Sequence, residues 1–455
     1  MAWHVVIAGG GFGGLYAART LERRLAPHSA RITLVNDVNF MLYTPLLPGA
    51  AGGSLEPRHV VVPLREHLNR TDLRLGTVVG AEPQRNCLQV QSHEGHTEEL
   101  TYDHLIVALG SVSRTLPIPG LAEHGIGFKS LPQAIALRNR LIRSLELAET
   151  LDDPDRRREY LTFVVVGAGY AGVEGLAELQ DFAADVLDLY PRCATTGMRW
   201  MLVEARDRVM QEAAPQLGEH AARELRGRGI EVRTSTTIEE VTARSVTLAG
   251  GEVVPTRTLV WTAGVKPHPI VARLGLPVDD GGRLRVDRRL RVEGHANVWA
   301  VGDAAAVPDP AHKGRQPTPP TAQHALRQGR LAARNVAASI GTGRVRPFRY
   351  KTKGFFAELG RREAVAATMG IRWRGLPAFL LTRTYHLAMM PGMGRRWRLL
   401  ADWNVGLLFG RDTAELGQLG QLPSLAGELQ AQSAGGTGED IGDRREPASV
   451  PTDQR

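Results

Sequence analysis

The chain has 455 residues, which is too long for a single hydrophobic core, so two or three domains are expected. Its net charge of +8 is concentrated between residues 346 and 412, where 13 Lys and Arg accompany 4 Asp and Glu, which argues against a nucleic-acid surface along the whole chain. Only two cysteines are present, Cys87 and Cys193, which excludes a cysteine-ligated iron–sulfur cluster and a CxxC redox pair.

Near the N-terminus, an apolar run over residues 5–8 breaks into glycines and continues with helical spacing. This order predicts a buried parallel strand, a tight turn and a helix N-terminus. Gly9, Gly11 and Gly14 fit the G-x-G-x-x-G pattern, in which glycines make the turn, admit a pyrophosphate and let the helix pack on the strand. Such a turn also occurs in other α/β domains, so this motif alone is weak.

The next predicted strand, residues 31–36, ends where an acidic side chain commonly binds a ribose. Asn36 stands there instead, and its amide can still bond a hydroxyl. The apolar, proline-stiffened segment 41–49 is expected to be neither strand nor helix, and it either covers a core or lies along a flat aromatic ligand. Three further strands are expected over residues 73–81, 86–91 and 100–108. The last ends in small residues, Ala108 and Gly110, which let a ligand approach the sheet.

The same arrangement then repeats. Residues 163–174 read as a second strand, glycine turn and helix, with Gly167, Gly169 and Gly172 at the first, third and sixth positions of the pattern. The strand that follows ends in Glu204, so the acid is present in this copy. Further strands are expected over residues 230–233, 246–249 and 259–265. Two similar units in one order indicate an internal duplication and argue against a coincidental turn.

After the second unit, strands are expected over residues 284–292 and 297–301, and a helix over 321–339. The second of these strands ends in Gly302 and Asp303. The aspartate can reach a polyol hydroxyl while nearby amides meet phosphate.

From Arg346 on, the sequence mixes Arg with Trp, Leu and Phe in two short amphipathic runs, 375–387 and 395–411. Such runs are typical of helices that lie in a membrane interface. The alternative is a helical pair packed on the domain body or in a homodimer interface. Beyond residue 427 the composition of Gly, Ser, Gln and charged residues predicts disorder.

Two dinucleotide modules in tandem, the first completed late by a Gly-Asp strand, are the arrangement of two-dinucleotide flavoproteins. The motifs GGGFGG, YTPLLPGA, GAGYAGVE, LVWTAGV, WAVGDAA and PPTAQHALRQG closely resemble the single-subunit, type II NADH:quinone oxidoreductases, over residues 4–417. The resemblance implies an α/β fold with two Rossmann-like domains, the NAD domain inserted in the FAD domain, and a C-terminal amphipathic membrane-associating segment. The expected parts are FAD domain 1–120 and 271–345, NAD(P)H domain 121–270, membrane-associating region 346–425 and disordered tail 426–455.

The resemblance also implies the residues of each site. For FAD these are Gly9, Gly11, Phe12, Gly13, Gly14, Asn36, Thr44, Pro45, Val79, Ala108, Gly110, Gly302, Asp303 and Ala322. For NADH they are Gly167, Gly169, Tyr170, Gly172, Glu204, Ala263 and Gly264. For the quinone they are Ala322, Gln323 and Gln328, and no metal is expected. Glu174 and Gln323 are the expected catalytic residues.

The implied activity is hydride transfer from NADH to flavin N5, followed by two-electron reduction of a membrane quinone, menaquinone or ubiquinone, without proton pumping. Gln323 is expected to bond a quinone oxygen. Glu174 is expected to tune or relay a proton, and its alternative role is a carboxylate that satisfies the helix dipole. Glu204 is expected to favour NADH over NADPH. The isolated His386 is expected to be structural or at the surface.

Two other functions stay open on the sequence. A ferredoxin or rubredoxin reductase also pairs FAD with NAD(P)H, and a redox-sensing protein of the apoptosis-inducing-factor type would bind both without rapid turnover. Sulfide:quinone oxidoreductases and disulfide reductases need a cysteine pair that is missing here. Because no apolar run approaches ~18 residues, no membrane span is expected. The expected location is peripheral, on the cytoplasmic face of the bacterial inner membrane, with a possible homodimer and no nucleic-acid partner.

Overall fold

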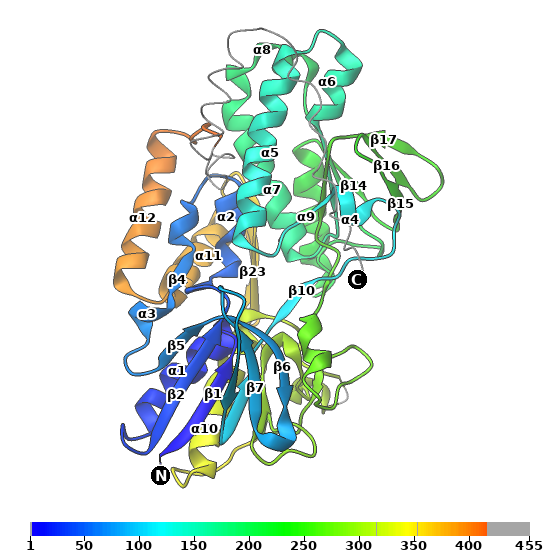
Figure 1. Ribbon diagram of the computed structural model, residues 1–455. Coiled ribbons are helices and arrows are strands. Elements are labelled where there is room, and N and C mark those ends of the chain that lie inside the picture. The colour runs from blue at the N-terminus through cyan, green and yellow to red at the C-terminus, as the bar shows by residue number, and fades with distance from the viewer. Residues whose placement is uncertain (1, 315, 353, 416–455) are drawn as a thin grey trace, which may run out of the picture. The chain divides into compact units, whose positions relative to one another are not determined.

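The computed structural model describes residues 2–314, 316–352 and 354–415, so the predicted disordered tail lies outside the described residues. The first apolar run forms the central strand of a five-stranded parallel sheet with the order β21-β9-β1-β2-β5. Strands β1, β2 and β5 of this sheet are labelled in Figure 1. The strands are β1 Trp3–Ala8, β2 Ala30–Asn36, β5 Asp72–Leu75, β9 His104–Val107 and β21 Val298–Ala300. In the sequence, β21 comes after all the strands of the second sheet. The first sheet is therefore made from two separate parts of the chain.

The second parallel sheet has the order β11-β18-β12-β13-β14. Its strands are β11 Gly125–Gly127, β12 Thr162–Val166, β13 Arg199–Val203, β14 Ile230–Arg233 and β18 Thr258–Trp261. β12 lies between β13 and β18 as β1 lies between β2 and β9, which is the structural form of the duplication seen in the sequence. The chain crosses between the sheets through an antiparallel pair, β10 Ser111–Ser113 with β19 Val265–Pro267.

Helices cover both sheets, as expected for parallel strands buried on two faces. The longer ones are α1 Phe12–Arg24, α5 Leu131–Thr150, α6 Pro154–Leu161, α7 Tyr170–Val186, α9 Pro215–Gly227 and α10 Ala322–Ser339. The shorter ones are α3 Leu64–His67, α4 Leu121–His124 and α8 Pro191–Thr196. α1 and α10 pack so closely that position 329 has room only for glycine, because a Cβ there would lie 2.0 Å from the Gly13 carbonyl oxygen.

Small antiparallel sheets flank the two parallel ones. They contain β6 Thr77–Glu82, β7 Cys87–Gln91 and β8 Thr97–Thr101, and β15 Ile238–Val241, β16 Ser245–Leu248 and β17 Val253–Pro255. The single strand predicted over 73–81 is wrong, since the chain leaves the parallel sheet at Gly76 and enters β6. The strand predicted over 284–292 is also wrong in extent, because only β20 Leu284–Arg285 pairs regularly, with β22 Ala305–Ala306.

The segment 41–49 was predicted without regular structure, and this is wrong. It contains the end of β3 Phe40–Leu42, which pairs with β4 Val61–Pro63, then a 3-10 turn over Thr44–Leu46 and the start of helix α2 Leu47–Ala51. Its prolines sit at the first positions of these helical turns, where the missing N–H is not needed. α2 packs against α5 and α7.

The C-terminal part begins with a three-stranded antiparallel sheet that the sequence did not predict. Its strands are β23 Gly354–Gly360, β24 Glu363–Thr368 and β25 Ile371–Arg374, and two helices follow, α11 Gly375–Met389 and α12 Met393–Leu408. β23, which is labelled in Figure 1, packs against α7, and α11 packs on β24. Among the described residues, no helix has the length and apolar character needed to cross a membrane.

Candidate functional site

The first glycine turn has the shape of a phosphate cradle. Gly11 caps α1 without any side-chain hydrogen bond, and a Cβ placed on Gly11 would meet no atom within 4 Å. By contrast, a Cβ on Gly14 would lie 1.7 Å from the carbonyl oxygen of Gly9, so this glycine lets the helix approach the strand. The open space and the free amides at the helix N-terminus fit the pyrophosphate of a dinucleotide such as FAD.

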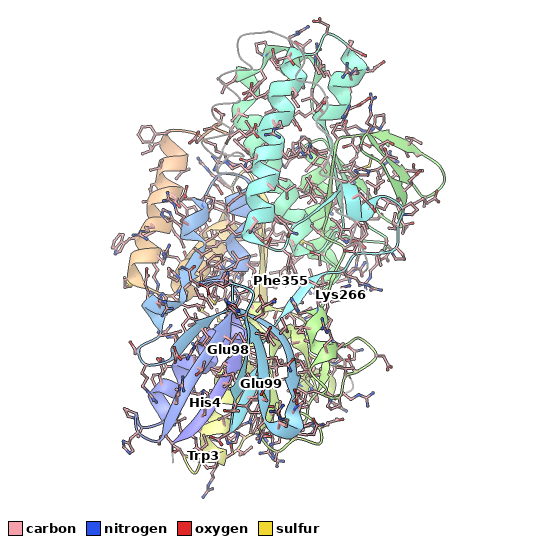
Figure 2. The ribbon with its side chains drawn as sticks, viewed as in Figure 1. Trp3, His4, Glu98, Glu99, Lys266 and Phe355 are labelled. Atoms are coloured by element: carbon pink, nitrogen blue, oxygen red, sulfur yellow. The ribbon has the colours of Figure 1, made fainter. Side chains whose placement is uncertain are left out.

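The second glycine turn repeats these features. Gly169 caps α7 without a side-chain bond, and its Cβ position is open. A Cβ on Gly172 would lie 1.9 Å from the carbonyl oxygen of Gly167. Tyr170, the first residue of α7, packs against Phe355 of β23 with ring centroids 5.5 Å apart. Figure 2 labels Phe355 on this strand. The C-terminal sheet therefore borders the second turn, where NADH would fit on the same grounds.

The two residues at the ribose positions hold their turns in the same way. Asn36 Oδ1 accepts a hydrogen bond from the backbone N–H of Gly10 at 2.7 Å. Glu204 Oε2 accepts one from the backbone N–H of Ala168, also at 2.7 Å, and its other oxygen accepts from the N–H of Arg206 at 2.9 Å. The amide of Asn36 thus replaces the expected acid in its contact with the turn.

The other residues predicted for FAD come from several elements. Ala108 and Gly110 follow β9, Gly302 and Asp303 follow β21, Phe12 and Gly13 open α1, Thr44 and Pro45 lie in the 3-10 turn, and Ala322 is the first residue of α10. Val79 lies outside the parallel sheet on β6, and in the second module Ala263 and Gly264 lie between β18 and β19.

Asp303 has a partner that the sequence did not single out. The hydroxyl of Ser111 donates to Asp303 Oδ2 at 2.5 Å, and Lys129 Nζ lies 2.9 Å from Ser111 Oγ and 3.7 Å from Asp303 Oδ2. Ser111 stands at the crossing between the two sheets, and Lys129 follows β11 in the second sheet. These contacts fix the carboxylate that was predicted to meet a polyol hydroxyl.

Gln323 is oriented by a tyrosine from outside its helix. The hydroxyl of Tyr350 donates to Gln323 Oε1 at 2.7 Å, while Gln323 Nε2 makes only a long contact of 3.5 Å with the Gly354 carbonyl. The ring of Tyr350 is held by Arg327, whose guanidinium lies 4.1 Å from its centroid, and by the edge of His324. This arrangement fixes the side-chain oxygen of Gln323 and leaves its N–H groups available to an acceptor.

The structure does not support a quinone contact for Gln328. Its side chain is fully buried, its oxygen accepts from the N–H of Gly302 at 2.7 Å, and its Nε2 donates to Thr318 at 2.9 Å. Both ends of the amide are satisfied inside the protein. Gln328 instead holds the Gly302 turn against α10.

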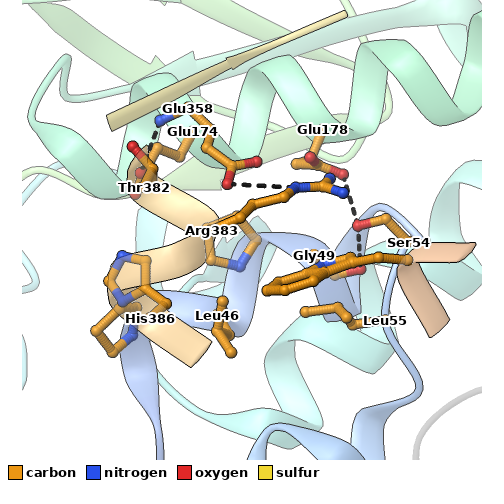
Figure 3. A pocket seen from close by; sticks show the side chains of 13 residues that line it. Leu46, Gly49, Ser54, Leu55, Glu174, Glu178, Glu358, Thr382, Arg383 and His386 are labelled. Atoms are coloured by element: carbon orange, nitrogen blue, oxygen red, sulfur yellow. Dashed lines mark hydrogen bonds and ion pairs between the residues drawn. The ribbon is translucent and has the colours of Figure 1, made fainter. Parts of the chain in front are cut away.

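Glu174 lines a small pocket that combines acidic and apolar groups (Figure 3). Glu174 Oε1 accepts a hydrogen bond from the backbone N–H of Glu358 at 3.1 Å, so it bonds a strand and does not cap its own helix. Arg383 Nε lies 3.8 Å from Glu358 Oε1. Other lining residues are Pro45, Leu46, Pro48, Gly49, Ser54, Leu55, Glu178, Thr382, His386 and Trp403.

Burial shifts the acid–base behaviour of this pocket. It raises the pKa of Glu174 well above its usual range, helped by the nearby charges of Glu358 and Glu178, and it raises the pKa of Glu358 to about 7. Burial also lowers the pKa of His386 to about 4, so this imidazole is neutral at physiological pH. His386 Nδ1 lies 3.3 Å from the hydroxyl of Tyr43, and this histidine, predicted to be structural or at the surface, is buried and also lines the pocket.

The sequence did not point to Glu358, Arg383 or Tyr350. Glu358 is a single acid in an apolar strand, and Arg383 is one arginine within a basic segment. Their place beside Glu174 depends on how β23 packs against α7, which no local pattern encodes.

Two glycine turns on two parallel sheets, the first completed by a Gly-Asp strand and α10, define a flavoprotein with two dinucleotide sites. In agreement, the family model described as "Pyridine nucleotide-disulphide oxidoreductase" matches residues 3–329, and the chain belongs to that family.

Relatives narrow the family further. The type II NADH:quinone oxidoreductase Ndh of Mycobacterium tuberculosis is 31% identical over 458 residues, which cover 94% of this chain and 95% of that protein. The demethylphylloquinone reductase NdbB of Synechocystis is 32% identical over 418 residues, covering 88% of this chain and 97% of the relative. The chain is a member of the type II NADH:quinone oxidoreductases, which confirms the resemblance noted in its sequence motifs.

A solved structure shares the fold. NDH2 from Plasmodium falciparum, determined in complex with NADH, superimposes with a TM-score of 0.84 and 19% sequence identity, and the match covers 91% of this chain and all of the other. The predicted α/β fold with two Rossmann-like cores is therefore confirmed.

Proposed function

We propose that this chain is an FAD-dependent NADH:quinone oxidoreductase that reduces a membrane menaquinone or ubiquinone without pumping protons. The observation that carries the proposal is the pair of open, uncapped glycine turns, of which only the first is completed by Gly302, Asp303 and α10. This asymmetry supports our proposal that the first turn holds FAD and the second holds NADH. Bound FAD supplies the chemistry that accepts a hydride from NADH and returns two electrons to the quinone.

The chain's own residues bind FAD, orient the quinone and supply a proton. Asp303, held by Ser111 and Lys129, is placed to bond a ribityl hydroxyl of FAD. Gln323, fixed through its oxygen by Tyr350, offers N–H donors, which a quinone oxygen requires because it can only accept. Burial raises the pKa of Glu174 and so favours its protonated form, and this suits a proton donor for quinone reduction.

Glu204 supports a preference for NADH over NADPH. Its carboxylate stands at the end of β13 beside the second turn, where it can accept from a ribose hydroxyl and repel a 2′-phosphate. Arg206 and Arg208 follow closely and reduce this repulsion, so the proposed preference is moderate.

We propose that α11 and α12 attach the enzyme to a membrane surface. The inner side of α12 buries Leu399 in the hydrophobic core and adds polar contacts: Asp402 Oδ2 lies 2.7 Å from His59 Nδ1, and Arg395 donates to the Arg58 carbonyl at 2.5 Å. Its outer side carries exposed apolar residues, including Trp397 and Leu408. An ordinary surface helix turns a polar face outward, so this exposed apolar face fits a helix whose outer side enters the lipid interface.

Exposed apolar residues on α11 extend the same surface. Leu376 and Leu380 lie one turn apart, and each exposes more than half of its surface. Arg396 and Arg398 stand next to Trp397 and can meet anionic headgroups. We propose a peripheral location on the cytoplasmic face of the bacterial inner membrane, and we retain the domain boundaries at residues 120, 270 and 345 as proposals.

The test is steady-state NADH oxidation by the purified full chain with short-chain menaquinone and ubiquinone analogues. Rapid turnover with either quinone is expected. If NADH bleaches the flavin absorbance but neither quinone restores it, the proposal is wrong. A ferredoxin-type reductase or a redox-sensing flavoprotein would then account for the site.

A further inference from the structure

We propose that Glu358 is a positioning residue for proton transfer, which shares one proton with Glu174 and thereby keeps that carboxyl ready to protonate the quinone. This inference rests on the proposed function. It concerns a residue on the C-terminal sheet, outside both dinucleotide modules.

Strand β23 connects two parts of the site, with Gln323 beside its first residue and the pocket of Glu174 beside Glu358. β23 starts at Gly354, whose carbonyl faces the Gln323 amide, and it reaches Glu358 four residues later, roughly 13 Å along a strand. Because side chains alternate on a strand, Phe356 and Glu358 share a face. Phe356 stacks on Tyr385 of α11 at 4.5 Å, and Glu358 lies beside Arg383 of the same helix.

Glu174 and Glu358 are joined by a hydrogen bond and share a pocket. The backbone N–H of Glu358 donates to Glu174 Oε1, and both side chains line the same small cavity (Figure 3). Two carboxylates in one buried pocket repel each other, so such a pair retains a proton over a pH range in which isolated carboxyls are ionised. The raised pKa of each group has burial as its main cause and agrees with this geometry.

Arg383 is held close enough to attract Glu358 but not to bond it. Its guanidinium lies 4.2 Å from the Phe379 ring centroid and 4.9 Å from that of Trp403, and its buried Nε has no hydrogen-bond partner. A fully bonded arginine would lock Glu358 as a carboxylate and lower its pKa strongly. At 3.8 Å, Arg383 instead stabilises the extra negative charge that appears when the pair gives up its proton.

Other charged and titratable groups also face Glu358. They come from α7, α11 and the segment after α12, and they are Glu174, Glu178, Asp181, Arg383, His386 and Arg411. Asp181 is paired with Arg228, and Glu178 with Arg411 and Ser54, so their charges are already compensated. His386 is neutral, which leaves Glu174 as the uncompensated neighbour of Glu358.

The proton count agrees with a pair that stores one proton. In the overall reaction NADH, quinone and one proton give NAD⁺ and quinol, and NADH provides both electrons and one of the two hydrogens. The remaining proton leaves Glu174 as its O–H bond breaks and the second quinol O–H bond forms. The pair is then doubly ionised, and solvent returns one proton to it, which is the proton that the overall reaction consumes.

The main test compares Glu358→Gln with Glu358→Asp and with the control Glu363→Gln, which removes a carboxylate from the neighbouring strand β24. In Glu358→Gln we expect quinone kcat to fall about tenfold at pH 8, within the range of general acid–base effects. In a plot of quinone kcat against pH, the alkaline limb of this variant should move down by about one pH unit, because the negative charge of Glu358 no longer raises the pKa of Glu174. The rate at which NADH bleaches the flavin should stay within about twofold. Glu358→Asp and Glu363→Gln should keep the wild-type pH profile.

A second measurement does not depend on turnover. Infrared difference spectra of the holoenzyme against pH should show a protonated carboxyl that titrates near pH 7 in the wild type and in Glu363→Gln, but not in Glu358→Gln. If Glu358→Gln keeps both this titration and the wild-type alkaline limb, the inference is wrong. If the wild type reduces no quinone, the proposed function fails, and the infrared titration alone decides whether the carboxyl pair exists.

Discussion

Two glycines of the second turn, Gly169 and Gly172, should respond differently to substitution by alanine, the first by losing NADH affinity alone and the second by losing stability as well. Gly169 has φ −71° and ψ −177°, a conformation open to alanine, and its Cβ would meet no atom within 4 Å. Gly169→Ala should therefore change the free energy of unfolding by less than about 1 kcal/mol. The new methyl group would occupy the space over the helix N-terminus where the pyrophosphate approaches. Loss of one charge-assisted hydrogen bond costs about 1.5–3 kcal/mol, so NADH binding should weaken by roughly 10- to 100-fold.

Gly172→Ala tests the packing role. Its Cβ would lie 1.9 Å from the Gly167 oxygen and 2.6 Å from Thr262 Oγ1, whereas ordinary contact begins near 3.4 Å. α7 would have to move by about 1.5 Å, and overpacking of this kind costs about 1–3 kcal/mol. This variant should lose thermal stability as well as NADH affinity.

The assay is titration of the FAD-loaded protein with NADH, followed by flavin absorbance and calorimetry, with thermal unfolding of each variant. Gly11→Ala is the matching test of the first turn, because a Cβ on Gly11, like one on Gly169, would meet no atom within 4 Å. It should lower the FAD content of a folded protein. Wild-type NADH affinity in Gly169→Ala would refute the assignment of the second turn, as would unchanged FAD content in Gly11→Ala for the first.

Three further changes test single contacts. Tyr350→Phe removes the bond that orients Gln323, so quinone KM should rise about 3- to 10-fold with NADH-driven flavin bleaching unaffected, and an unchanged KM would contradict this role. Glu204→Gln keeps an oxygen for the turn but removes the charge, so the NADPH to NADH ratio of kcat/KM should rise about tenfold; equal rates with both nucleotides in the unmutated protein would already exclude the role. Combined Trp397→Gln and Leu408→Gln should release the enzyme from anionic liposomes without unfolding it, and binding that survives these changes would defeat the proposed membrane face.

The glycine turns and the parallel strands were predictable because their determinants are local. A β-branched run that breaks into glycines must leave a sheet and start a helix, and both copies do so at the expected residues. Gly302-Asp303 and the helix after Thr321 were recognised by their place in the chain order. These patterns fix each module without any information about distant contacts.

The C-terminal sheet was not predictable in the same way. The sequence from Gly354 to Arg374 alternates weakly and carries many arginines, so it resembled part of an amphipathic surface segment. Its strands are stabilised by packing of β23 on α7 and of α11 on β24. The grouping of Glu174, Glu358 and Arg383 depends on that tertiary contact, which is why sequence analysis found only the first of them.

The packing of β23 on α7 has a practical consequence for anyone who wants a shorter, lipid-free version of this enzyme. A cut after residue 345 would follow the end of the second dinucleotide module, but it would strip β23 from α7 and remove Ala357, Leu359 and Val365, which are buried in the hydrophobic core of the second module. Such a fragment would be prone to aggregate. Polar replacement of the outer face of α12 keeps the chain whole and is the safer route to a protein that can be handled without detergent.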